Sequence, residues 1–389
     1  MTQDQALEKE ADRAAAAGQF DAARSLLEQA VEADSSSANF GLWMKLSAMR
    51  KASGDLAGAL AAINSALTIS QRDLPALLSR ALILDDLGDP DAGEAYRQVL
   101  GQIRPDAAIP PELQPAVGHA RKRYDEYRTT VEQYLLGNLP AGLGAAEQSR
   151  AERFVSNRAR KTQHYHQGPA EYHYPGMPEI EFHDPGLFPG LRELEQATET
   201  IRAEFDALIA AEAAEMVPYI QYPDHVSLRQ WEELNRNPRW TAIHLLQYGW
   251  RVDVNARHCP KTMAAISKLD QPQVAGASPV AMFSLLAPRT RIPAHRGVTN
   301  TRLVCHLPLI VPPGCGFRCG ATTREWRVGE AFVFDDTIEH EAWNDSDELR
   351  VVLIVDLWPP ALGPGDRRVA AAVIGASNAN FVAAHEPGQ

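Results

Sequence analysis

Three similar phrases recur near the start of the chain, and their spacing constrains its fold more than any other feature. They are Gly18-Gln-Phe-Asp-Ala-Ala23, Gly54-Asp-Leu-Ala-Gly-Ala59 and Gly88-Asp-Pro-Asp-Ala-Gly93, so their first glycines lie 36 and 34 residues apart. Each phrase stands between Ala- and Leu-rich stretches whose apolar residues recur at helical spacing. Glycine suits the tight bend between two helices because it tolerates a positive φ. The spacing therefore predicts consecutive helix–turn–helix pairs.

A period near 34 residues with helix–turn–helix units resembles tetratricopeptide repeats, with three units over residues 4–104. A generic helical bundle is the alternative. Solenoids of this kind usually present a surface to partners. We therefore expect the helical repeats to dock a protein or peptide partner.

The middle of the chain changes character twice. Pro- and Ala-rich residues 104–112 break the helical pattern, and a further helix is predicted over 113–136. The following Gly-, Pro- and His/Tyr-rich stretch reads as a connector, which contains Gln163-His-Tyr-His-Gln-Gly168. These histidines could bind a metal, but alternating aromatic and polar residues favour a docked loop. Apolar periodicity then predicts one long amphipathic helix from Phe188 to Met216.

From about residue 240 short β-rich runs alternate with turn residues. The predicted strands are 241–249, 280–287, 302–311, 316–319, 324–327, 331–334 and 350–358. The most apolar of them is Arg350-Val-Val-Leu-Ile-Val-Asp-Leu-Trp358. Closely spaced short strands of this kind indicate a double-sheet barrel or jelly roll.

Charge and composition exclude several classes of function. The net charge of −12 argues against a nucleic-acid groove, which needs clustered Lys and Arg. No signal peptide and no transmembrane segment are recognisable, so we expect a cytoplasmic protein. The four cysteines are few, which suits a reducing compartment. Cys315 and Cys319 are interpreted as buried or edge thiols, with a zinc site as the minor alternative.

Two histidines in the β-rich part could hold a metal. His295 lies in Pro293-Ala-His-Arg-Gly297 and His340 in Ile338-Glu-His-Glu341, 45 residues later. Iron sites on a jelly roll use imidazoles from separate strands together with a carboxylate two residues after the first histidine. Gly297 occupies that carboxylate position here. On spacing alone, an unrelated pair of histidines stays open as the alternative to a metal site.

Longer stretches around both histidines resemble the aspartyl/asparaginyl β-hydroxylase family. The resemblance covers roughly residues 172–360 and is dense over 282–359, including Phe334-Asp-Asp-Thr-Ile-Glu-His-Glu-Ala-Trp-Asn344 and the Arg350 strand. Members of this family use two histidines and leave the third facial position to solvent, so Gly297 fits the resemblance. A helical-repeat region before the oxygenase domain also occurs in this family.

The resemblance implies a set of cofactors and residue roles. It implies Fe(II) as the metal, 2-oxoglutarate as cosubstrate and O2, in a dioxygenase that hydroxylates an unactivated C–H, with Asp or Asn side chains of a protein or peptide as the expected target. His295 and His340 would bind iron. Arg350 would pair with the distal carboxylate of 2-oxoglutarate, which a guanidinium meets with two parallel hydrogen bonds. The cosubstrate would also contact Ser284, His306 and Arg302.

Val304 departs from the family pattern, which often has Arg at this place. It favours a competing hypothesis, a repeat protein for interactions with a degenerate, non-catalytic oxygenase domain. Two further hypotheses are a hydroxylase of a small molecule or lipid, and a cupin-like metal hydrolase or isomerase. Asp335 and Asp336 could be rival ligands, but Phe-Asp-Asp before Thr337 is interpreted as a turn.

The expected fold class is a multidomain α and β protein. A TPR-like helical repeat domain is predicted over 1–136, followed by a connector over 137–174. A double-stranded β-helix (jelly-roll) oxygenase domain with supporting helices is expected over 175–362, and a tail over 363–389.

Overall fold

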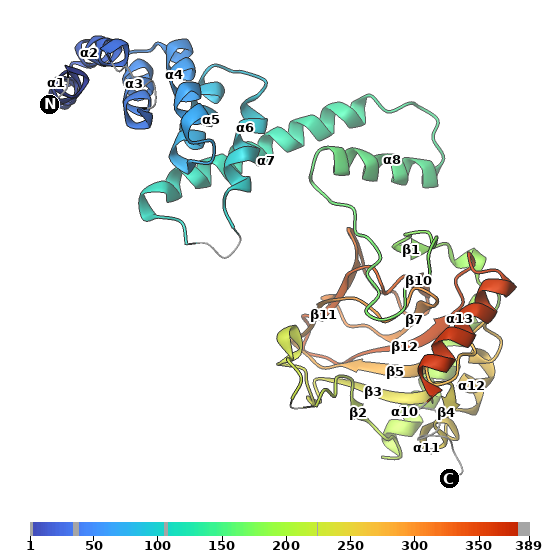
Figure 1. The fold of residues 1–389 in the computed structure, drawn as a ribbon. Coiled ribbons are helices and arrows are strands. Elements are labelled where there is room, and N and C mark those ends of the chain that lie inside the picture. Colours follow the sequence, from blue (N-terminus) through green and yellow to red (C-terminus); the bar gives the residue numbers. More distant parts are fainter. Residues whose placement is uncertain (1–2, 34–38, 105–107, 224, 380–389) are drawn as a thin grey trace. The chain divides into compact units, whose positions relative to one another are not determined.

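The computed structural model describes residues 3–33, 39–104, 108–223 and 225–379, and the chain divides into two compact units at Thr162/Gln163 (Figure 1). The first unit is helical. Its helices are α1 (Gln3–Ala16), α2 (Phe20–Ala33), α3 (Phe40–Ala52), α4 (Leu56–Ile69), α5 (Leu74–Asp86), α6 (Ala92–Gly101), α7 (Gln114–Gly137) and α8 (Ala145–Arg158). The last of these lies within the stretch predicted as a connector.

The repeated glycines lie at the turns inside the helix pairs α1–α2, α3–α4 and α5–α6. Gly18, Gly54 and Gly88 have φ values of +74°, +84° and +66°, the left-handed conformation that glycine reaches without strain. Asp55 and Asp73 cap the helices that follow them, because their side chains accept hydrogen bonds from backbone N–H groups one turn on. The predicted helix–turn–helix repeats are confirmed.

Small alanines let these helices pack closely, as the sequence predicts. Ala59, Ala62, Ala66, Ala76 and Ala81 are almost completely buried between helices α3 to α6. Helix α7 continues the stack through Val117 and Ala120, which join the cluster that contains residues of α5 and α6. The first unit thus has its own apolar core.

The second unit is built on two antiparallel sheets. The larger sheet has the strand order β1-β10-β7-β12-β5-β3-β2, with β4 paired to β3, and the smaller has the order β6-β11-β8-β9. The strands are β1 (Phe182–His183), β2 (Val217–Pro218), β3 (Trp240–Gln247), β4 (Trp250–Arg251), β5 (Ala281–Leu286), β6 (Thr290–His295), β7 (Leu303–Ile310), β8 (Cys315–Cys319), β9 (Thr322–Arg324), β10 (Phe332–Phe334), β11 (His340–Asn344) and β12 (Arg350–Leu357).

The two faces of the larger sheet take alternate residues of each strand. On β12, Val351, Leu353 and Val355 face a core shared with helices, whereas Val352 and Ile354 face a core shared with the smaller sheet. This explains why β12 is buried along its whole length and reads as a continuous apolar run. The predicted order of helical repeats followed by an antiparallel β domain is confirmed.

Helices cover the outer face of the larger sheet, on one side of the β domain in Figure 1. These helices are α9 (Leu191–Gln196), α10 (Thr198–Ala210), α11 (Asp253–Ala256) and α12 (Pro260–Ile266). Helix α13 (Pro364–Ser377) packs through Ile374 in a separate cluster with Val274, Trp358 and Leu362. Helix α13 falls in the predicted tail, of which residues 380–389 lie outside the described residues. In the described part of the chain, no helix combines the length and apolarity that crossing a membrane requires.

The prediction of one long helix from Phe188 to Met216 is wrong. The segment forms α9 and α10, which are separated at Ala197, and helical structure ends at Ala210. The Thr198 hydroxyl donates to the Glu195 carbonyl at 2.6 Å, and Ala197 N–H is shared between the Glu193 carbonyl at 3.2 Å and the Leu194 carbonyl at 3.1 Å. This tight local bonding interrupts the regular ladder although the apolar periodicity continues through it.

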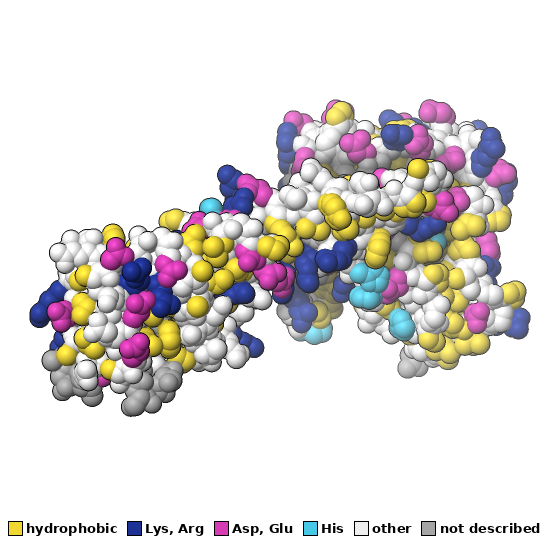
Figure 2. Space-filling view, turned by 90° about the horizontal axis from the view of Figure 1, so that it is seen from above, with side chains coloured by type: hydrophobic (Ala, Val, Ile, Leu, Met, Phe, Trp, Pro, Cys, Tyr) yellow, Lys and Arg dark blue, Asp and Glu magenta, His cyan; other side chains and the backbone are white. Residues whose placement is uncertain are grey.

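The face drawn in Figure 2 carries basic and acidic side chains interspersed with one another.

The four cysteines are all buried and free, as expected for Cys315 and Cys319. Cys315 Sγ lies 3.3 Å from the Asn344 side-chain oxygen, and Cys319 Sγ lies 3.6 Å from the Asp335 carbonyl oxygen.

Candidate metal and cosubstrate site

A cavity of about 530 Å³ opens between the two sheets, and all six of the predicted site residues line it: Ser284, His295, Arg302, His306, His340 and Arg350. The period of the strands explains why the larger sheet contributes so many. Ser284, His306 and Arg350 are even-numbered residues of β5, β7 and β12. The apolar residues of these strands that face the smaller sheet are even-numbered too, so all of them lie on the same face. Val304 lines the same cavity from β7.

His295 and His340 face each other across neighbouring strands of the smaller sheet. His295 ends β6, His340 begins β11, and the two residues are paired in the antiparallel register. Their ring centroids are 4.1 Å apart. The chain thus brings together two imidazoles that are 45 residues apart in sequence.

Each of these rings is oriented by a backbone carbonyl two residues earlier. His295 Nδ1 lies 2.8 Å from the Pro293 oxygen, and His340 Nδ1 lies 3.0 Å from the Ile338 oxygen. A carbonyl oxygen only accepts, so Nδ1 carries the hydrogen in both rings. The lone pair of each neutral imidazole is therefore on Nε2, the arrangement of metal-binding histidines.

Burial keeps both rings neutral. It lowers the pKa of His295 to about 3, and the neighbouring His340 contributes in the same direction. Burial likewise lowers the pKa of His340 to about 4. Two neutral nitrogen donors side by side can bind a divalent transition metal without first losing a proton.

Arg350 is a buried cation without an anion. Its side chain is 2% exposed, and within the described residues no carboxylate lies in ion-pair range and Nε has no hydrogen-bond partner. One guanidinium nitrogen is 3.4 Å from the Ser284 carbonyl, and the group lies over the Trp326 ring at 4.8 Å. Burial lowers the pKa of Arg350 to about 10. A carboxylate ligand would satisfy this charge.

His306 lines the cavity together with Arg350 and His340, and both of these side chains act on its pKa. Burial lowers its pKa well below the ordinary value, and the Arg350 charge adds to the effect. Its Nδ1 is buried and has no partner among the described residues. The Ser284 hydroxyl accepts a hydrogen bond from Trp240 Nε1 at 3.1 Å, which leaves its own hydrogen available to an acceptor in the cavity.

Arg302 differs from Arg350 because its charge is already balanced. It forms ion pairs with Asp336 at 3.0 Å and Asp356 at 3.6 Å. These two carboxylates raise the pKa of Arg302 against the opposing effect of burial. Of these two arginines, Arg350 is therefore the one whose charge no carboxylate of the described residues balances.

Asp336 is a cavity residue that the sequence pattern places only in a turn. The turn is confirmed: Thr337 N–H and its hydroxyl donate to the Asp335 carboxylate at 2.9 and 2.6 Å. Asp336 is directed the other way and lines the cavity with Oδ1 buried and without a partner in the described chain. The sequence signal that could have found it is its position four residues before His340.

Gly297 packs directly against Asp336. Its N–H donates to the Asp336 carbonyl at 2.7 Å, and a Cβ on Gly297 would lie 2.1 Å from Asp336 Oδ2. A side chain two residues after His295 therefore has no room while Asp336 holds this place. The acidic group next to that position is Asp336, which lies in the turn between β10 and β11.

Aromatic rings enclose the histidine pair on its open side. Tyr219 stacks on Trp240 at 3.8 Å between centroids, and Trp231 meets the His295 ring edge-on at 5.0 Å. No motif in the sequence indicates these rings as site residues. They form an apolar wall that limits water around the pair.

Comparison with known proteins gives a consistent result for this part of the chain. Residues 195–360 match the family model for aspartyl/asparaginyl beta-hydroxylase. A Rhizobium tropici ornithine lipid ester-linked acyl 2-hydroxylase is 34% identical over 185 residues, which are 47% of this chain and 62% of that protein. The human aspartyl/asparaginyl beta-hydroxylase is 37% identical over 139 residues, 35% of this chain and 18% of that protein.

The chain spans less than two thirds of the length of the curated relatives it matches. Among solved structures, the TPR domain of Sgt2 from Aspergillus fumigatus is 20% identical and covers 39% of this chain and 95% of that domain, with a TM-score of 0.29. That score is too low to define the helical region, whose architecture rests on its own helix pairs. The part of the chain that carries the cavity is therefore similar to the aspartyl/asparaginyl β-hydroxylase family.

Proposed function

We propose that this protein is an Fe(II)- and 2-oxoglutarate-dependent dioxygenase that hydroxylates an unactivated C–H bond. The observation that carries the proposal is the facing pair His295 and His340, with both Nδ1 atoms engaged and both Nε2 atoms free to bind a metal. Imidazole nitrogens suit Fe(II). When bound, iron, 2-oxoglutarate and O2 together supply one oxygen atom to the C–H bond and give succinate and CO2.

The chain's other residues fit the cosubstrate. Arg350 offers a buried, unpaired guanidinium to one carboxylate, and the Ser284 hydroxyl lies on the neighbouring strand in register with Val352. His306 Nδ1 and Asp336 Oδ1 are buried polar atoms that lack partners among the described residues, so each can bind a polar group in the cavity. Arg302, already paired, holds Asp336 in place.

The proposed substrate is an Asp or Asn side chain of a protein or peptide. The family description supports this choice, and the helical repeats offer a docking surface for a polypeptide. A lipid or small-molecule substrate is the second candidate, because the Rhizobium tropici acyl 2-hydroxylase is 34% identical to this chain over 185 residues.

Removal of either histidine tests the proposed metal site. We expect His295→Ala and His340→Ala to abolish succinate formation from 2-oxoglutarate, because each substitution removes one of two protein donors to the metal. His258→Ala is the matched control, since His258 is exposed and lies outside the cavity. Full turnover in either cavity variant would rule out this metal site.

The substrate is tested by mass spectrometry. Lysate proteins and lipids incubated with the wild type should gain one oxygen atom on a specific product, and the His340→Ala protein should give none. A modified peptide would support the Asp/Asn proposal, whereas a modified acyl chain would support the second candidate.

Val304 supports a competing proposal, a non-catalytic interaction protein with a degenerate site. The anaerobic addition of iron(II) and 2-oxoglutarate distinguishes the two. A visible metal-to-ligand charge-transfer band is expected for the dioxygenase and is absent for a degenerate site.

A further inference from the structure

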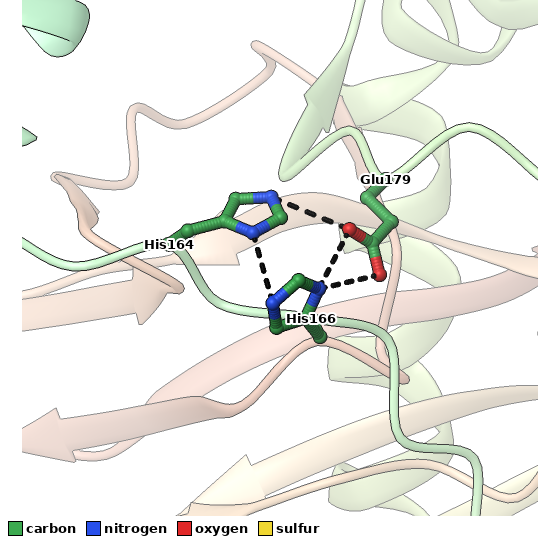
Figure 3. A group of neighbouring side chains, drawn as sticks. All are labelled: His164, His166 and Glu179. Carbon is green, nitrogen blue, oxygen red and sulfur yellow. Dashed lines mark hydrogen bonds and ion pairs between the residues drawn. The ribbon is translucent and has the colours of Figure 1, made fainter.

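A second group of metal-ligating side chains lies on the surface of the second unit, away from the cavity residues. Among the described residues, one group of three or more such side chains has ligand atoms within 4.8 Å of one another: His164, His166 and Glu179. Figure 3 shows the two imidazoles and the carboxylate turned toward one another. None of the three lines the cavity between the sheets.

The local sequence explains how two histidines reach the same side. In an extended segment, residues i and i+2 project to one face and the residue between them to the other. Tyr165 turns inward, where it packs against the core between the sheets and lies under the Arg318 guanidinium at 5.6 Å. The same alternation directs His164 and His166 outward together. The loop can therefore be docked on the β domain through Tyr165 and still bind a metal through His164 and His166.

Glu179 follows the turn at Pro175 and Gly176, and it is held in place by the histidine loop. Its Oε1 accepts a hydrogen bond from the Gln167 backbone N–H at 2.9 Å. Gln167 itself bonds to Asp335 and to the side chain of Asn300, and Gly168 N–H donates to the Thr337 carbonyl at 2.9 Å. The loop is thus fixed on a rigid part of the β domain before any ligand binds.

The distances suit a small tetrahedral ion. Glu179 Oε2 is 3.3 Å from His164 Nε2 and 3.1 Å from His166 Nδ1. Two ligand atoms at about 2.0–2.1 Å from a tetrahedral zinc ion lie about 3.3–3.4 Å apart. Small rotations of exposed side chains would therefore bring all three atoms into a zinc shell, with water in the fourth position.

We propose that His164, His166 and Glu179 form a zinc-binding site that joins the two ends of the segment 163–179. Two imidazoles and one carboxylate are typical zinc donors, whereas calcium and magnesium require mainly oxygen ligands. Both imidazoles are exposed, with 56% and 73% of the side chains of His164 and His166 accessible, so an ion can reach them from solvent. The site is independent of the proposed dioxygenase activity.

The test counts zinc equivalents in five full-length proteins, because the His295/His340 pair is expected to bind zinc as well. After dialysis against a weak chelator, the wild type should retain two equivalents. His164→Ala/His166→Ala and His340→Ala should each retain one, and the triple variant none. His173→Ala, an exposed histidine of the same segment, is the control and should retain two. Magnesium should be retained by none of them.

Each result separates the two sites. Equal zinc content in the wild type and in His164→Ala/His166→Ala would overturn the surface site. Equal content in the wild type and in His340→Ala would count against the cavity site and leave the surface site standing. Glu179→Gln keeps the acceptor for the Gln167 N–H but not the charge, and it should also lose one equivalent. Zinc should slow proteolysis within 163–179 in the wild type, and an unchanged rate would also contradict the proposal.

Discussion

At the scale of single residues, Arg350 carries the clearest conflict between stability and function. A guanidinium that is 2% exposed and has no anionic partner in the described chain costs folding free energy, on the order of a few kcal/mol. Proteins retain such a group when a bound ligand neutralises its charge. A variant without this charge can therefore show whether Arg350 serves ligand binding or the stability of the fold.

Replacing Arg350 by methionine should therefore have opposite effects on the free and the bound protein. Arg350→Met removes the unpaired charge at similar length, so the Tm of the free protein should stay equal or rise. A ligand at 100 times its Kd stabilises by about 2.7 kcal/mol. The rise in Tm that 2-oxoglutarate gives the metal-loaded wild type should disappear in the variant. Arg324→Met, outside the cavity, should keep that rise, and a rise retained by Arg350→Met would remove Arg350 from the proposed site.

Some cavity residues can be predicted from the pattern of their own strand, and others depend on contacts between distant segments. Ser284, His306 and Arg350 stand in strongly apolar strands, so the alternation of each strand already indicates their common face. Asp336 cannot be assigned in this way. Its side chain reaches the cavity because Gly297, from a different segment, leaves the space for it, and that approach exists only in three dimensions.

At the scale of elements, the strands that carry the histidine pair are among those that the pattern fails to predict. β6 contains Arg291 and Pro293, and β11 contains Glu341 and Asn344, so neither reads as an apolar or cleanly alternating run. Both belong to the smaller sheet, whose outer side is partly exposed. By contrast β12, buried on both faces, is predicted almost to the residue. A strand that is buried on both faces has a more recognisable apolar sequence than a strand that carries metal-binding residues.

Within the helical unit, one carboxylate joins three helices. Asp85 of α5 accepts hydrogen bonds from Tyr96 of α6 at 2.8 Å and from Arg123 of α7 at 2.8 and 2.6 Å. The Arg123 bonds are the main cause that holds the pKa of Asp85 below its ordinary value. This interaction fixes the last repeat against the helix that follows it.

Asp85→Asn should destabilise the helical unit by about 1 kcal/mol, since the partly exposed Arg123 weakens the charge contribution through solvent screening. Because the folded pKa is depressed, the stabilisation is complete above the unfolded pKa of about 3.9 and is lost as pH falls through the lower folded value. Thermal unfolding followed by helical circular dichroism between neutral and acidic pH measures this. Asp86→Asn, which removes the exposed pair with Lys51, is the matched control and should change little. Equal losses in both variants would contradict the role of Asp85.

At the scale of the whole molecule, the boundary of the β domain differs from the predicted one in a way that affects the site. The segment 163–174 is predicted to be part of a connector, yet it belongs to the β unit. Ala170 N–H donates to the Gly297 carbonyl at 2.9 Å, and Tyr172 N–H donates to the Val298 carbonyl at 3.0 Å. These bonds hold the backbone that follows His295. The His/Tyr-rich composition of the segment carries no sign of this pairing.

Two truncations that differ by twelve residues test where the domain begins. We propose that residues 163–389 fold alone, because this unit has its own apolar cores, and that they retain the rise in Tm with metal and 2-oxoglutarate. Residues 175–389, which start at the predicted boundary, lose the bonds to Gly297, Val298 and Thr337. We expect this shorter fragment to have a lower Tm and a smaller response to the ligands. Equal behaviour of the two fragments would show that the segment is a connector after all, and failure of the longer one to fold would show that the β unit depends on the helical repeats.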